Sequence, residues 1–87
     1  MIGLLDLLKL SEVSPVRVSG DASFSGIVAD SRKDVRGKLF VCMPSEATDT
    51  HGFIVDVALR GASAVIVHGN EGFEIAVRNG LSCLQLE

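Results

Sequence analysis

Two polar segments of this sequence carry groups that could bind an anion, and each of them follows an apolar run. Asp30-Ser31-Arg32 comes directly after the run 24–29, and the polar segment 44–50 follows the run 39–43. A serine hydroxyl donates a hydrogen bond, an arginine guanidinium presents a planar fork to carboxylate or phosphate, and loop amides add further donors. These residue types favour the holding of an anionic ligand.

The charge of the chain narrows the class of ligand. The net charge is −3, which argues against a general nucleic-acid binder because such proteins depend on neutralising phosphates. Half of the eight basic residues nevertheless lie within one short stretch: Arg32, Lys33, Arg36 and Lys38. This stretch is either a solvated loop or a local anion site on an acidic protein.

Catalytic groups are harder to find in the sequence. It contains no GxxxxGK[ST] or GxGxxG phosphate motif, no GxSxG elbow and no HExxH zinc pair. We expect His51 to cap or pack at a helix start, His68 to lie in a surface loop, and Asp30 to pair with Arg32 or cap a turn. Cys42 and Cys83 form no CxxC pair and are expected to be buried as small hydrophobic residues, so no metal is predicted.

The composition indicates one small domain of 87 residues, of which 47% are hydrophobic. The first ten residues lack the basic start and cleavage site of a signal peptide, and no apolar stretch is long enough to span a bilayer. We therefore expect a cytoplasmic protein without a membrane partner.

The apolar periodicity predicts alternating strands and helices. We expect helices at 3–10, from His51 to Gly61 and from Asn70 to Gly80, and strands at 16–18, 24–29, 39–43, 64–67 and 82–86. The second half then reads strand–helix–strand–helix–strand, which is typical of parallel strands in an α/β fold. In such sheets ligands gather beyond the carboxyl ends of the strands, so the segments after 24–29 and 39–43 would share one rim if their strands are parallel neighbours.

The order of short motifs along almost the whole chain resembles the N-terminal domain of the Mur ligases. The family pattern runs roughly G-I-x-x-D-S-R-x-V-x-P-G-x-L-F-V, then D-G-H-x-F, then A and G-A-x-A-V. The matching residues here are Gly26-Ile27, Asp30-Ser31-Arg32, Val35, Gly37 to Val41, Asp49, His51, Phe53, Ala58, Gly61-Ala62 and Ala64-Val65. The resemblance implies a small three-layer α/β sheet domain with βαβ crossovers over residues 1–87.

In this family the domain holds the UDP end of a UDP-N-acetylmuramoyl-peptide. By position, the resemblance implies that the substrate-binding residues are Ala29, Ser31, Glu46, Ala47 and Thr48, with Arg32 as a further anion contact. The run 40–44 is most similar to the members that add the third amino acid of the peptidoglycan stem. The members that add the terminal D-Ala-D-Ala dipeptide are the close second.

The sequence departs from the family pattern around the implied nucleotide loop. Arg36 stands where the family has proline, and Ser45 and Thr50 stand where it has glycine. Glu46 would also bring negative charge close to a diphosphate, which is unfavourable unless its side chain points away.

The resemblance also implies partners that these residues do not contain. Mur ligases use ATP and Mg²⁺ in a central domain, and a C-terminal domain helps to place the incoming amino acid. We therefore expect this chain to bind UDP-N-acetylmuramoyl-dipeptide and its own central ligase domain, and to need no cofactor and catalyse nothing by itself. Two alternatives stay open: an interaction module that has lost the nucleotide, and a small free-standing α/β enzyme.

Overall fold

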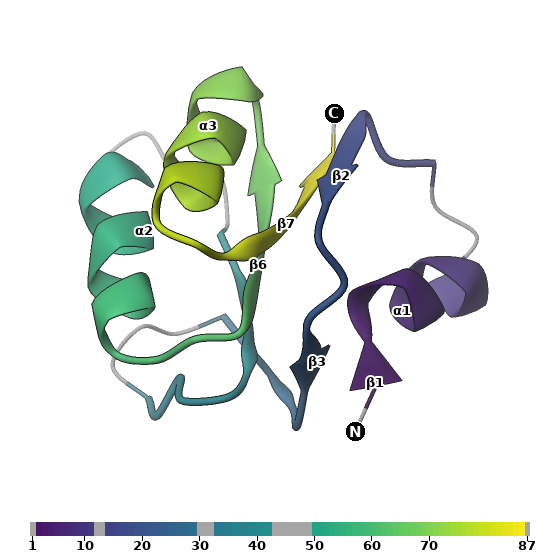
Figure 1. The fold of residues 1–87 in the computed structure, drawn as a ribbon, viewed down its shortest axis with the longest axis horizontal. Helices are drawn as coiled ribbons and strands as arrows, with labels where there is room; N and C mark the ends of the chain where they lie inside the picture. Colours follow the sequence, from purple (N-terminus) through teal and green to yellow (C-terminus); the bar gives the residue numbers. More distant parts are fainter. Residues whose placement is uncertain (1, 12–13, 30–32, 43–49, 87) are drawn as a thin grey trace.

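A computed structural model describes residues 2–11, 14–29, 33–42 and 50–86, without the side chains of Thr50 and His51. The described chain contains both strands and helices, which alternate from β5 onward (Figure 1). In chain order they are β1 (Ile2–Gly3), α1 (Leu4–Ser11), β2 (Arg17–Ser19), β3 (Ser23–Phe24), β4 (Ile27–Val28), β5 (Leu39–Val41), α2 (Thr50–Leu59), β6 (Ala64–His68), α3 (Asn70–Arg78) and β7 (Ser82–Leu86).

The main sheet has five strands in the order β2-β7-β6-β5-β4, and β1 and β3 form a separate antiparallel pair. Strands β4 to β7 are parallel neighbours, and β2 closes the sheet by pairing antiparallel with β7. The predicted strand–helix–strand–helix–strand unit is therefore confirmed as β5-α2-β6-α3-β7, in a mostly parallel α/β sheet.

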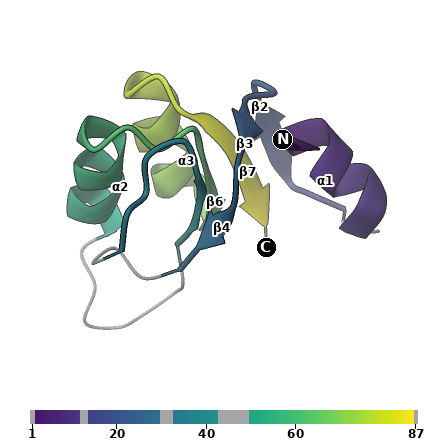
Figure 2. The ribbon, with the colours of Figure 1, turned by 90° about the horizontal axis from the view of Figure 1, so that it is seen from below.

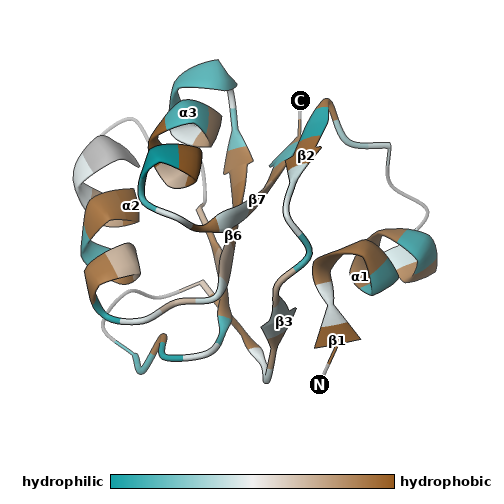
Figure 3. Ribbon diagram, viewed as in Figure 1, coloured by the Kyte–Doolittle hydropathy of each residue, from teal (hydrophilic) through white to brown (hydrophobic). Residues whose placement is uncertain are grey.

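Helices α2 and α3 lie on one face of this sheet, and α1 lies on the other face (Figures 1 and 2). Successive residues of β6 alternate between the two faces: Val65 and Val67 pack under α2 and α3, whereas Ala64 and Ile66 pack toward α1. This two-residue period places apolar side chains on both faces, as is typical of a sheet covered on both sides. Figure 3 shows β6 coloured mostly as hydrophobic.

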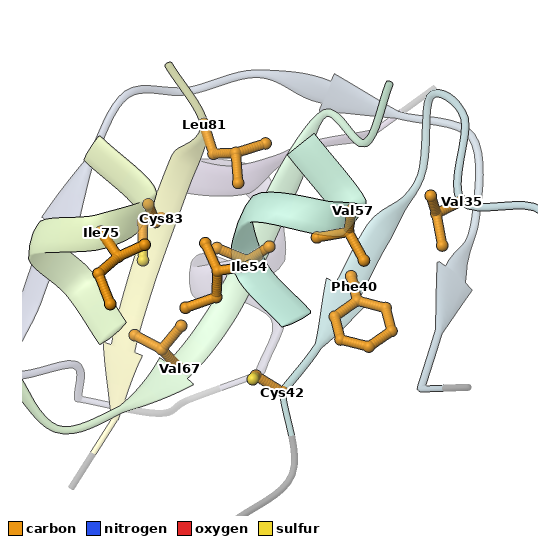
Figure 4. Close-up of a cluster of buried hydrophobic side chains, with 11 residues drawn as sticks. Val35, Phe40, Cys42, Ile54, Val57, Val67, Ile75, Leu81 and Cys83 are labelled. Atoms are coloured by element: carbon orange, nitrogen blue, oxygen red, sulfur yellow. The ribbon is translucent and has the colours of Figure 1, made fainter. Parts of the chain in front are cut away.

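Two hydrophobic clusters result. The cluster under α2 and α3, here called the helix-side cluster (Figure 4), consists of Val35, Phe40, Cys42, Ile54, Val57, Val65, Val67, Ile75, Ala76, Leu81 and Cys83. The α1-side cluster consists of Leu4, Phe24, Leu39, Ala64 and Leu84. The first cluster includes Val35, which is 1% exposed although it lies in the polar stretch predicted as a plain loop.

Both long helices end at a glycine with a positive φ, as the sequence predicts. Gly61 follows α2 with φ 90° and Gly80 follows α3 with φ 77°. At the end of α2 the amide of Ala62 donates to the carbonyl of Val57 at 3.0 Å, and Gly61 donates to Ala58 at 3.1 Å. This pair of bonds satisfies the last carbonyls of the helix and needs a left-handed residue, which glycine adopts without a steric cost.

The prediction of one strand over 24–29 is wrong, because the chain changes sheet at Ser25 and Gly26. Phe24 pairs with Ile2 in the small sheet, whereas Ile27 pairs with Leu39 in the large one. Antiparallel pairing with β1 keeps Phe24 inside the α1-side cluster at 3% exposure. A long-range partner has thus divided a locally continuous apolar run.

Candidate functional site

The carboxyl ends of β4 and β5 lie side by side at one edge of the main sheet, here called the carboxyl edge. Their parallel register pairs Val28 with Phe40, so the segments that follow both strands leave from the same edge. The condition that the sequence left open, that the two strands are parallel neighbours, is therefore met. Ala29, which directly follows β4, is exposed there.

Most of the predicted binding residues lie outside the described residues. These are Ser31, Arg32, Glu46, Ala47 and Thr48. Their assignment therefore stays a prediction, and what the structure supplies is the position of the strand ends from which their segments depart.

Helix α2 begins where the segment 43–49 ends, and its first turn contains no acidic residue. Because α2 connects the parallel strands β5 and β6, its amino terminus lies at the carboxyl edge. Free amides and the helix dipole give a helix start a partial positive charge. This arrangement favours an anion at the edge beside β4 and β5.

The base of this region is anchored in the helix-side cluster. Cys42 follows β5, and its amide donates to the carbonyl of Ile66 at 2.9 Å. Its side chain is 6% exposed, and Ile54, in the first half of α2, is fully buried in the same cluster (Figure 4).

Arg36 and Lys38, which the structure describes, do not lie at the carboxyl edge. The amide of Gly37 donates to the carbonyl of Gly61 at 2.9 Å, and the carbonyl of Lys38 accepts from Ser63 at 3.0 Å. These bonds hold 36–38 at the opposite edge, beside the turn that leads into β6. Among the described basic residues, Arg36 and Lys38 are therefore separated from the predicted anion site.

A polar cluster that the sequence did not reveal lies where β7 and β2 meet the start of α3. Arg17 Nε donates to Gln85 Oε1 at 2.9 Å, and Gln85 Nε2 donates to Asn70 Oδ1 at 2.9 Å. The guanidinium also donates to Asn70 at 3.3 Å and lies 4.1 Å from the ring centre of Phe73. We call Arg17, Asn70, Phe73 and Gln85 the α3 latch. In the sequence, the one feature that points to this cluster is Gln85, a polar residue within the otherwise mostly apolar run 82–86.

Several smaller expectations can be compared with the structure. Cys42 and Cys83 are buried, as expected, and burial raises the pKa of both thiols, that of Cys83 to about 12. His68 is exposed, as expected, but it is the last residue of β6 rather than part of a loop.

Across the described residues no group of three or more His, Cys, Asp or Glu side chains is placed to hold a metal ion. No helix in that part of the chain is long and apolar enough to cross a membrane.

No known protein-family model matches the chain, but individual proteins do. It is 33% identical to the UDP-N-acetylmuramoyl-L-alanyl-D-glutamate–2,6-diaminopimelate ligase of Clostridioides difficile over 64 residues, which are 74% of this chain and 13% of the relative. It is 40% identical to the ligases of the same name from Cytophaga hutchinsonii over 57 residues (63% and 12%) and Bacillus cereus over 52 residues (60% and 11%).

The matched segments thus span 11–13% of the length of these relatives. The three relatives carry the same name, although they come from different organisms. This agreement supports the assignment of the chain to the Mur ligase family.

Proposed function

We propose that this chain is the N-terminal domain of an ATP-dependent peptidoglycan-precursor ligase and holds the UDP end of a UDP-N-acetylmuramoyl-dipeptide. The observation that carries the proposal is the parallel pairing of β4 with β5. It sends the Asp30-Ser31-Arg32 segment and the segment 43–49 away from the same edge of the sheet. The similarity to diaminopimelate ligases supports the same assignment.

The physical chemistry of this edge suits a nucleotide diphosphate. Ser31 offers a hydroxyl, Arg32 offers a guanidinium, and the backbone of 46–48 offers amides. The start of α2 adds a partial positive charge without an acidic residue in its first turn. In the proposed site Ala29, Ser31 and the loop Glu46 to Thr48 contact the nucleotide, and Arg32 contacts its phosphates.

The remainder of the reaction belongs to parts of the ligase beyond these 87 residues. We propose that ATP and Mg²⁺ act in a central domain, which is also the partner of this domain. In this proposal the parent ligase adds the third stem amino acid, because the relatives above are named as ligases that join 2,6-diaminopimelate to UDP-N-acetylmuramoyl-L-alanyl-D-glutamate. A D-Ala-D-Ala-adding parent is the second candidate, because the sequence pattern around Ser31 resembles both.

The test is an NMR titration of the chain with UDP-N-acetylmuramoyl-dipeptide and, separately, with UDP. We expect the amide shifts of Ala29, Ser31 and 46–48 to move, and both ligands to bind. Ser31→Ala should weaken binding about three- to tenfold, the effect of one lost hydrogen bond. Ser63→Ala, at the opposite edge, is the matched control and should leave affinity unchanged.

Unchanged shifts at millimolar ligand would contradict nucleotide binding and favour the interaction module instead. The departures at Ser45 and Thr50 make this comparison informative, because glycines there would allow a backbone path that other residues restrict. Replacing both residues by glycine should then strengthen binding if the loop retains its family role.

A further inference from the structure

We propose that the outer side of β4, at Gly26 and Ile27, docks an extended segment of a partner protein in which apolar and acidic residues alternate. Strand β4 is the last strand of the main sheet, and among the described residues no strand pairs with its other side. An unpaired strand edge presents amide and carbonyl groups to which an added strand can bond. The backbone of this edge, the pocket beside it and the nearest charge all suit such a segment.

The backbone of β4 is already held in place for a further strand. The amide of Leu39 donates to the carbonyl of Gly26 at 2.9 Å, although the residue aligned with Leu39 is Ile27. In a parallel pair this pattern turns the amide and carbonyl of Ile27 away from β5. The amide of Ser25 adds a second anchor, since it donates to the Gly37 carbonyl at 2.9 Å. The outward groups of Ile27 are therefore fixed in direction before a partner binds, which lowers the entropy cost of binding.

An apolar pocket with a volume of about 470 Å³ opens beside this edge. It is lined by Ile2, Phe24, Ser25, Gly26 and Ile27. Ile27 is aligned with Leu39 of the α1-side cluster and so lies on the same face, yet Ile27 is 56% exposed. Helix α1 thus leaves this end of the face uncovered. An apolar side chain of an added strand, placed beside Ile27, would enter the pocket and bury part of this exposed surface.

The other face of the same edge carries a positive charge. A Cβ at Gly26 would lie 3.7 Å from Lys38 Nζ, so the ammonium group lies beside a residue that has no side chain. Among the described residues no carboxylate forms an ion pair with Lys38. Neighbouring residues of a strand point to opposite faces, so Gly26 faces away from the pocket side of Ile27. An added strand with an apolar residue beside Ile27 therefore places its next side chain near Lys38, where a carboxylate is favoured.

A second copy of this chain suits the edge less well than a partner of that kind. Residues 25–29 contain no acidic side chain, so β4 of another copy would supply no carboxylate to Lys38. Pairing β4 with itself would instead bring two Lys38 ammonium groups to one face, which is unfavourable. Each copy also has a net charge of −3, which opposes association.

The first experiment is an NMR titration of the chain with a short peptide of alternating valine and glutamate. A peptide of alternating valine and lysine is the matched control, because it has the same apolar face and the opposite charge. We expect the amide shifts of Gly26, Ile27 and Lys38 to move with the glutamate peptide and to stay unchanged with the lysine peptide. Ile27→Pro removes the outward amide without removing a bond to β5, and it should abolish binding.

The second experiment separates the charge from the apolar contact. Lys38→Gln should weaken the glutamate peptide about threefold at low salt and less at high salt, because an exposed ion pair is modest and screened. Lys9→Gln makes the same change of charge on α1 and should leave the affinity unchanged. Ile27→Thr keeps a residue suited to a strand, removes the apolar contact and should also weaken binding.

Each contrary outcome has a definite meaning. Unchanged shifts at millimolar peptide, or shifts away from β4, would overturn docking at this edge. Equal binding of the two peptides, or equal effects of Lys38→Gln and Lys9→Gln, would overturn the acidic partner. Self-association of Lys38→Gln without a loss of peptide affinity would show that Lys38 only keeps the edges of two copies apart.

Sedimentation of the native chain tests the remaining occupant. A native dimer that Ile27→Thr dissociates would assign the edge to a second copy and overturn the proposal. If Ile27→Pro does not fold, Ile27→Thr and Lys38→Gln still decide the matter, since both positions are at least partly exposed. None of these titrations contains a nucleotide, so their result is independent of the proposed function.

Discussion

The two halves of the carboxyl edge differ in how their polar groups are used. At the β6–β7 half, the side chains of Arg17, Asn70 and Gln85 hydrogen-bond to one another. At the β4–β5 half, β4 and β5 end in segments whose polar residues face a ligand in the proposed function. The helix starts differ as well: the first turn of α3 contains Glu71, whereas that of α2 has no acidic residue.

This difference suggests that polar groups at the β6–β7 half stabilise the fold, whereas those at the β4–β5 half are available for the proposed ligand. In the α3 latch, Gln85 is 4% exposed and its amide bridges Arg17 and Asn70, so an entering ligand would have to break bonds already made. The first turn of α2, by contrast, contains no acidic residue. The polar side chains of the β6–β7 half thus bond to one another, whereas the β4–β5 half is the one that we propose to hold an anion. Four experiments test this division, beginning with the largest expected effect.

The first uses the pH dependence of unfolding. Burial, and then the nearby thiol of Cys42, raise the pKa of Cys83 from 9.0 to about 12, against a lowering effect of Arg17. Because the thiol ionises less readily in the folded chain than in the unfolded chain, its contribution to the free energy of unfolding is complete below pH 9 and is lost as the pH rises toward 12. Up to about 4 kcal/mol should disappear over that window. Urea unfolding from pH 8 to 11 measures the first part of this loss, about 2.7 kcal/mol. Cys83→Ala should flatten the pH profile, and equal slopes in both proteins would contradict the prediction.

The second disturbs the packing of α3 on the sheet. A Cβ at Gly72 would lie 3.2 Å from Val67 Cβ and 3.6 Å from Ile54 Cδ1, so a larger side chain forces the helix outward. Gly72→Leu should cost about 1–3 kcal/mol in the free energy of unfolding. Glu74→Leu, on the exposed side of the same helix, is the control and should change it little. Equal unfolding midpoints for the two variants would show that the contact is not tight.

The third removes the bridge of the α3 latch. Gln85→Leu keeps a buried side chain of similar size but deletes the bonds to Arg17 and Asn70, which are exposed and can turn to water. We expect a loss of about 1–2 kcal/mol in the free energy of unfolding and a nucleotide affinity within about twofold of native. A loss of affinity as large as that of Ser31→Ala would show that the two halves of the edge are coupled.

The fourth concerns the opposite edge and has the smallest expected effect. Arg60 is paired with Asp56 at 3.1 Å on the surface and donates to the Lys33 carbonyl at 2.8 Å. Because the pair is solvent-exposed, Arg60→Ala should cost about 0.5 kcal/mol, less at high salt, without a change in nucleotide affinity. Thermal unfolding at low and high salt checks the first part, and a titration checks the second; a salt-independent loss would point to the carbonyl bond instead.

Local patterns in the sequence predicted the second half of the fold well. The apolar runs predicted at 39–43, 64–67 and 82–86 contain the strands β5, β6 and β7. Gly61 and Gly80 follow the helix ends because a left-handed residue completes the closing bonds. The parallel order then follows from short helical crossovers. The shared edge of β4 and β5 followed only on the condition that they are parallel neighbours, which the structure supplies.

The first half resisted prediction because its elements are short and their partners are distant. β3 and β4 have two residues each, and nothing local shows that Phe24 pairs with Ile2 while Ile27 pairs with Leu39. Nothing local shows, either, that hydrogen bonds to the turn after α2 hold 36–38 at the edge opposite to the carboxyl edge.

The sequence by itself determined the class of the fold, the ends of its long helices and the two segments that are proposed to bind a nucleotide, because these depend on residue type and short spacing. Only the tertiary structure decided the split of 24–29 between two sheets, the burial of Val35 and the joining of Arg17 to Gln85, which are 68 positions apart. The physical reason is that such contacts join residues that are distant in the sequence and form only when the sheet assembles. Local periodicity reports on neighbouring residues and therefore cannot predict them.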